Sequence, residues 1–85
     1  MAREIVIALG GAHSWNFIGD VVETATTLVI KNAYCIRRWG TTAGLGELAV
    51  NGPTDQTLLD YYGDVEVCSM DGCIRIKCVY EGELK

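Results

Sequence analysis

Two arginines, a tryptophan and a glycine–threonine run stand together in residues 35–47, CIRRWGTTAGLGE. The forked guanidinium groups of Arg37 and Arg38 suit phosphate oxygens, and the indole ring of Trp39 can stack on a base. Backbone N–H groups and hydroxyls that precede a helix can receive an anion with the help of the helix dipole. The segment therefore predicts a site for a small anionic, nucleotide-like ligand. The residues of this predicted site are Arg37, Arg38, Trp39, Gly40, Thr41 and Thr42.

The same segment has a structural interpretation, which the sequence leaves open. Either arginine can pair with one of eleven acidic residues, Trp39 can fill the core, and the glycines can simply turn the chain. Two known phosphate-binding motifs do not apply. Residues 44–49, GLGELA, match the letters of the dinucleotide fingerprint, but that motif needs a strand and a long helix in a βαβ unit. No Gly-Lys-Ser/Thr follows the glycines, so the segment is not a P-loop.

A second polar and aromatic group, HSWN at residues 13–16, follows two glycines and is expected in a loop. Trp15 is an alternative ring for stacking, and His13 is a candidate ligand contact. Catalysis would need His13 to meet a nucleophile and an orienting carboxylate, a geometry that one sequence does not establish. We expect no catalytic residue, no metal ligand and no cofactor, and hence a binding protein rather than an enzyme.

Length and charge limit the protein further. A chain of 85 residues supports one small domain, here residues 1–85, and leaves little room for a deep cleft. The net charge of -4 and the pI of about 4.7 argue against binding of duplex nucleic acid, which needs a basic surface. The apolar run near the N-terminus, IVIALG, is too short for a signal or a membrane span. We therefore expect a cytosolic protein with no membrane partner.

The four cysteines, Cys35, Cys68, Cys73 and Cys78, are expected to be buried thiols that act as small apolar side chains. Two disulfides are the alternative, and their pairing stays open. A zinc site is disfavoured, because such sites use short Cys-x2-Cys pairs and this chain has a single histidine.

Alternation of apolar residues predicts a series of short strands. They are expected at residues 3–9, 17–23, 28–30, 33–39, 65–68 and 73–80. Turns are expected at 24–27 and at Lys31-Asn32, and Met70-Asp71-Gly72 predicts a hairpin turn between the last two strands. The acidic and aromatic residues 55–64 are expected in a solvated loop anchored by two rings, with a metal or partner surface as the alternative.

Residues 45–51 are the one expected helix, because Leu45, Leu48 and Ala49 have helical spacing. Thr42 is expected to cap its N-terminal end, and Gly52-Pro53 to end it. The predicted fold is mainly β with one short α-helix. A doubly wound parallel sheet is excluded, because each parallel crossover would need a dozen or more residues. We expect a small antiparallel sheet curled into a barrel or half-barrel. Residues 28–30 or 73–80 are expected to be edges that pair with another copy, which favours a homo-oligomer.

Two segments carry a resemblance to a known group of proteins. They are LVIKNAYCIRRW at residues 28–39 and GLGELAVNGPT at residues 44–54. They resemble small phage and prophage proteins with the pattern L-x-x-A-R-x-I-x-x-W followed by L-x-x-L-A-x-x-G. Tyr34 stands where that pattern has arginine, so a role of that arginine does not carry over. The resemblance implies a phage origin, the cytoplasm of a host bacterium and an accessory role, and it is silent about activity.

Three functions fit these features. The first is a homo-oligomeric anti-defence sponge that sequesters a nucleotide-derived immune signal of the host. The second is an inhibitor that resembles anti-CRISPR proteins, with a host defence protein as its partner. The third is a decoration protein of the virion. The cluster of arginines, aromatic rings and glycines on an acidic chain favours the first.

Overall fold

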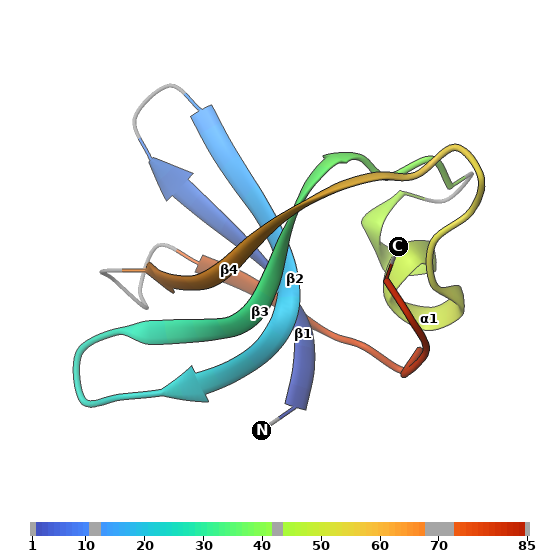
Figure 1. Cartoon of the computed structure of the whole chain (residues 1–85). Coiled ribbons are helices and arrows are strands. Elements are labelled where there is room, and N and C mark those ends of the chain that lie inside the picture. The colour runs from blue at the N-terminus through green and yellow to red at the C-terminus, as the bar shows by residue number, and fades with distance from the viewer. Residues whose placement is uncertain (1, 11–12, 42–43, 68–72, 85) are drawn as a thin grey trace.

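The protein is a single antiparallel sheet with one short helix (Figure 1), and the computed structural model describes residues 2–10, 13–41, 44–67 and 73–84. The elements are β1 Ala2–Gly10, β2 His13–Glu23, β3 Leu28–Arg38, α1 Leu45–Asn51, β4 Leu58–Val67 and β5 Cys73–Lys77. The strand order is β4-β3-β2-β1-β5, with every neighbouring pair antiparallel. The mainly β prediction is confirmed. Strands β4 and β5 are the two edges, so the hydrogen bonding of the described strands does not close the sheet into a barrel.

Both faces of the sheet carry buried apolar side chains. On the helix face, the side chains of Ile5, Ile18 and Ile36 pack with Leu48 of α1. The opposite face, which we call the open face, holds a cluster formed by Val6, Phe17, Val21, Leu28, Ile30, Ala33 and Cys35. Side chains alternate along a strand, so consecutive residues such as Ile5 and Val6 can both be buried. This explains why the central strands read as nearly continuous apolar runs.

Strand β3 is continuous where the sequence predicted two strands and a turn. Asn32 has a left-handed backbone, with φ 53°, and the pairing of β3 with β4 shifts register between Ile30 and Ala33. Asparagine tolerates this conformation, and a β-bulge absorbs the irregular residue without ending the strand. The predicted turn at Lys31-Asn32 is therefore wrong. Residues 28–30 lie between β2 and β4, so the prediction that they form a free edge is also wrong.

The loop predictions for residues 13–16 and 55–64 are wrong in large part. Strand β2 begins at His13, and β4 spans residues 58–67. Within β4, Gly63 has φ 79° and lies opposite Ala33, at a second register shift. Glycine adopts this conformation without strain. A residue that looks like a turn signal in the sequence is again an irregularity inside a strand.

The last two strands do not form the predicted hairpin. Strand β5 pairs with β1, from Ala8 opposite Cys73 to Glu4 opposite Lys77, and β4 pairs with β3. The turn predicted at residues 70–72 lies outside the described residues, as does Cys68. An Asp-Gly pair predicts a turn, but it does not predict which strands pair, because strand pairing depends on packing. Residues 73–77 are nevertheless an edge strand, as expected.

Helix α1 has the predicted bounds, Leu45–Asn51, and begins directly after Gly44. Gly44, with φ 75°, precedes the first helical residue, and no side-chain hydrogen bond of a described residue caps this end, where the sequence predicted a cap by Thr42. Thr42 itself lies outside the described residues. At the other end the N–H of Gly52 donates to the carbonyl of Leu48 at 2.9 Å. Gly52 also packs against the ring of Tyr80, where a Cβ atom would lie 2.6 Å from ring carbons.

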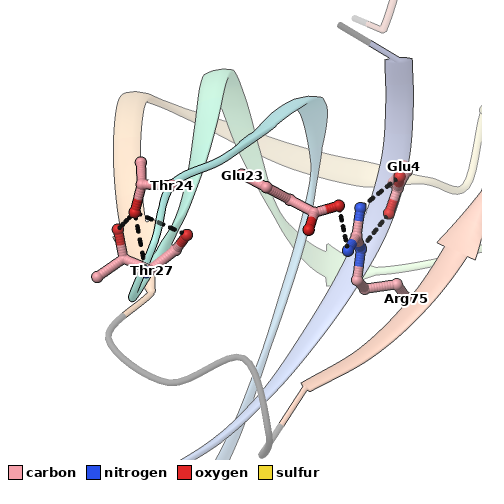
Figure 2. Close-up of polar contacts among 5 residues, drawn as sticks. All are labelled: Glu4, Glu23, Thr24, Thr27 and Arg75. Carbon is pink, nitrogen blue, oxygen red and sulfur yellow. Dashed lines mark hydrogen bonds and ion pairs between the residues drawn. The ribbon is translucent and has the colours of Figure 1, made fainter.

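A buried ion pair fastens the edge strand β5 to β1 (Figure 2). Arg75 donates from Nε to Oε1 of Glu4 at 2.7 Å and from Nη2 to Oε2 at 2.9 Å, and from Nη1 to Glu23 at 3.0 Å. Glu4 is buried, and the hydrogen bonds from Arg75 to Glu4 and Glu23 raise the pKa of the guanidinium above its usual value. The arginine therefore stays charged and supplies the donors that a buried carboxylate requires.

The predicted turn between β2 and β3 is confirmed, and two threonines stabilise it. The N–H of Thr27 donates to the hydroxyl of Thr24 at 2.9 Å, and the two hydroxyls lie 2.8 Å apart (Figure 2). The two hydroxyls form hydrogen bonds with polar groups of the turn, which would otherwise bond only to water.

The described cysteines are thiols. Cys35 is buried, Cys73 and Cys78 are half-buried, and none of these three forms a disulfide. Burial raises the pKa of all three, that of Cys78 to about 11. The prediction of thiols is confirmed for these three residues, and the prediction of burial for Cys35 alone among them. Within the described part of the chain, no helix is long and apolar enough to cross a bilayer.

Candidate ligand-binding surface

Three aromatic side chains lie together on the open face. Trp15 and Phe17 are two residues apart on β2, so they share a face, and their rings are nearly parallel at 6° with centroids 6.1 Å apart. Tyr62 of β4 meets the ring of Phe17 edge-on at 5.8 Å. Phe17 is buried, whereas Trp15 is 47% and Tyr62 50% exposed. We call Trp15, Phe17 and Tyr62 the aromatic surface.

Cys35 connects this surface with a charged pair on β3 and β4. It lies opposite Phe17 in the pairing of β2 with β3 and opposite Asp60 in the pairing of β3 with β4. Burial raises the pKa of its thiol, and a hydrogen bond from Tyr62 opposes that shift. Asp60 raises and Arg37 lowers the same pKa through their charges. Asp60 lies opposite Cys35 and contacts Arg37, so both charges lie near the thiol, at the border of the aromatic surface.

Arg37 and Asp60 form a loose ion pair. Nη1 of Arg37 lies 3.4 Å from Oδ2 of Asp60, and the two side chains are 64% and 47% exposed. Exposed pairs of this kind contribute little to stability. Among the described residues, Arg37 has no other polar partner, so most of its N–H donors face water. The guanidinium is held near the aromatic surface and remains able to bind an anion.

Trp39 and Gly40 are fixed to a neighbouring turn. The hydroxyl of Thr57 donates to the carbonyl of Trp39, and that of Thr54 to the carbonyl of Gly40, both at 2.7 Å. Gly40 has φ 66°, and a Cβ atom there would collide with the backbone of Gln56 and Thr57. Gly40 therefore has a structural role, because it lets the chain pass close to the turn at residues 54–57. The indole of Trp39 is 45% exposed, and its ring makes no aromatic contact among the described residues.

The loop before α1 uses its polar groups internally where it is described. The hydroxyl of Thr41 donates to the carbonyl of Gly44, which leaves its hydrogen unavailable to a ligand. Arg38 is exposed and, among the described residues, forms no ion pair or hydrogen bond. The backbone of His13 lies at the start of β2, opposite Gly10, and its side chain falls outside the described part of the structure.

The structure thus brings together Trp15 and Arg37 from the predicted site and adds three residues that the sequence did not single out as site residues. These are Phe17, Asp60 and Tyr62. Two sequence signals indicated the strands that carry these residues. Trp15 and Phe17 are two residues apart, which is typical of β2, and residues 64–67, DVEV, alternate as expected for β4. Their contact across three strands depends on register, which the sequence pattern does not contain.

The aromatic surface is open and lies apart from two grooves elsewhere on the molecule. One groove of about 460 Å³ is bordered by the turn after α1 and by Leu84. Another, of about 570 Å³, follows the Arg75 ion pair along β1 and β5. Neither is lined by a residue of the aromatic surface or by Arg37.

The arrangement suits binding of a molecule that has both a ring and a negative charge. An exposed indole face accepts a flat ring, and a solvated guanidinium on the same face of the sheet accepts phosphate or carboxylate oxygens. In comparisons with family models, with curated proteins and with solved structures, nothing matches this chain.

Proposed function

We propose that the protein is a non-enzymatic binding protein for a small anionic ligand that carries a planar ring, such as a nucleotide. One observation supports this above the others. The half-exposed indole of Trp15 lies parallel to Phe17, and Phe17 lies opposite Cys35, so Trp15 shares a face with Arg37, two residues beyond Cys35 on β3. The ring of the ligand stacks on Trp15 or against Tyr62, and its anionic group binds Arg37.

Arg38 and Trp39 stay candidate contacts in this proposal, because both side chains are exposed at the end of β3 and follow Arg37 directly in the chain. Gly40 and Thr41 have a structural part in this proposal, because they fix the path of the chain after the strand. The net charge of -4 does not oppose local anion binding, since a single guanidinium with few partners dominates the field at short range.

We further infer that the protein acts by sequestration, as a homo-oligomer in the cytoplasm of a host bacterium. Sequestration needs no turnover, and the resemblance to phage proteins supports the setting. The free edge of β5 and its exposed Ile74 support self-association, which sedimentation equilibrium measures directly. The half-barrel stays a prediction, supported by the packing of Val67 on β4 and Cys73 on β5 against one apolar cluster.

Calorimetry tests the proposed function with adenosine monophosphate, cyclic di- and trinucleotides and isomers of ADP-ribose. We expect micromolar binding of at least one of them. Trp15→Ala should weaken it about tenfold or more through lost stacking, and Arg37→Gln by a similar factor through a lost charged hydrogen bond.

Two matched variants control for changes elsewhere on the sheet. Tyr61→Ala removes a ring that is 60% exposed and meets Tyr34, which packs on the helix face. Lys77→Gln removes a cation from the far edge strand. Both should bind as the parent does. Absence of binding across the panel, or equal losses in the control variants, would contradict the proposal.

A protein inhibitor of a host defence complex is the alternative, with an acidic surface as its means. Asp60, Asp64 and Glu66 lie along the edge strand β4. Two of these carboxylates pair with Arg37 and Lys31, which reduces the negative field available to a basic partner. Stoichiometric copurification of one host protein would favour this alternative, and recovery from purified virions would favour a decoration protein.

A further inference from the structure

We propose that Asp60 is a built-in competitor of the ligand, occupying Arg37 until an anion of sufficient charge displaces it. This inference rests on the proposed function and assigns the residue that sets the charge selectivity of the same surface. A ligand with a negatively charged group competes with the carboxylate for the guanidinium, whereas a neutral ring can stack without disturbing the pair.

The geometry of the pair suits exchange. The distance between Nη1 of Arg37 and Oδ2 of Asp60 is 3.4 Å, and no hydrogen bond joins the two side chains among the described residues. The Arg75–Glu4 pair of the same sheet is different, with two hydrogen bonds of 2.7 and 2.9 Å to a buried carboxylate. A long, solvated contact is easily broken, and a short bidentate one is not.

The position of Asp60 makes it a competitor rather than a distant charge. It lies opposite Cys35 on β4, one residue before the pair of tyrosines that includes Tyr62. An anion bound to Arg37 therefore approaches the carboxylate as well. Asp60 weakens anion binding twice, since it neutralises the guanidinium and repels the incoming charge.

Asp64 supplies a matched control on the same strand. It pairs with Lys31 at 3.1 Å, and both of those side chains are also about half exposed. Asp60→Asn and Asp64→Asn each change the net charge by one unit. Only Asp60 has Arg37 and the aromatic surface beside it, so a general charge effect would appear in both variants and competition in one.

The test measures binding of adenosine monophosphate and adenosine to the parent and to both variants by calorimetry at one fixed salt concentration. Asp60→Asn should bind the monophosphate about three- to tenfold more tightly, the gain expected when one exposed pair and one repulsion are removed. Its affinity for adenosine, and both affinities of Asp64→Asn, should stay within about twofold of the parent, the range of an effect too small to assign to one charge.

A second readout separates this inference from the proposed function. Pyrophosphate is titrated while the Nε–Hε resonance of Arg37, assigned with Arg37→Gln, is followed by NMR. A larger response in Asp60→Asn than in the parent and Asp64→Asn supports competition even if no nucleotide binds. Unchanged or weaker monophosphate binding in Asp60→Asn, an equal gain for adenosine, or an equal pyrophosphate response in all three proteins overturns it.

Discussion

At the scale of single residues, two arginines in this sheet show how burial separates a structural role from a binding role. Arg75 is about one-third exposed and encloses the carboxylate of Glu4, which is almost fully buried. Arg37 is about two-thirds exposed and touches a carboxylate that is itself half in water. Breaking the first pair leaves a buried carboxylate without its donors, whereas the second pair can exchange partners in water.

Arg75→Met should destabilise the protein by about 2 kcal/mol, because it leaves Glu4 as a buried and unpaired charge. The loss is below that of a fully buried pair, since water reaches part of Arg75. Urea denaturation measures it. Lys31→Met, which breaks the exposed pair with Asp64, is the matched control and should cost much less. Equal losses of unfolding free energy in the two variants would show that burial of Glu4 does not make its ion pair more important for stability.

At the scale of elements, the end of β3 and the start of α1 depend on two glycines with left-handed backbones. Gly40 and Gly44 have φ values of 66° and 75°. A Cβ atom at Gly40 would meet the backbone near Gln56, whereas Gly44 has open space around it. The two positions therefore separate backbone strain from steric conflict.

Gly44→Ala should cost about 2 kcal/mol, because φ 75° and ψ -150° lie in a backbone region that essentially only glycine occupies. Gly40→Ala should cost about 3 kcal/mol, because the turn that holds Trp39 and Gly40 must also move away. Thermal unfolding of both variants checks the order. If the two melt together, the close approach between Gly40 and the turn is not required for stability.

Elements with strong local signals were predictable from the sequence. Helix α1 has the predicted bounds because Leu48 and Ala49 form its buried side and Gly52 ends it. The strands were split or shortened where Asn32 and Gly63 resemble turn residues, since a β-bulge and a turn use the same left-handed conformations. Local sequence does not reveal which of the two forms, because pairing with a distant strand decides it.

The candidate site was predictable to a similar degree. Trp15 and Arg37 were singled out by residue type, because few side chains offer an indole face or a guanidinium fork. Phe17, Tyr62 and Asp60 were not, because their part in the surface follows from the registers of β2, β3 and β4. The contribution of Thr41 was overestimated, since its hydroxyl already donates to Gly44.

At the scale of the whole molecule, three buried or half-buried thiols couple the stability of the protein to alkaline pH. Burial raises the pKa of Cys78 to about 11, and Cys35 and Cys73 shift in the same direction. A raised pKa means that the folded protein holds the thiol proton more tightly than the unfolded chain. This contribution to stability is complete below the unfolded pKa of about 9 and is lost as the pH rises through the folded pKa.

The free energy of unfolding should therefore fall between about pH 9 and pH 11, and Cys78→Ala should flatten part of that fall. Urea denaturation at a series of pH values measures it. Tyrosines and lysines also titrate in this range, so the comparison with Cys78→Ala carries the test. An identical decline in parent and variant would assign the pH dependence to those other groups.

The pairing of β1 with β5 has a consequence for how the protein is made. Glu4 meets Lys77 across the sheet, and Arg3 donates to the carbonyls of Tyr80 and Gly82, so partners more than seventy positions apart complete the structure. A nascent chain leaving the ribosome exposes β1 long before its neighbour on that side is synthesised. One edge of β1 therefore stays unpaired during synthesis, and β5 can pair with it only after β5 has left the exit tunnel.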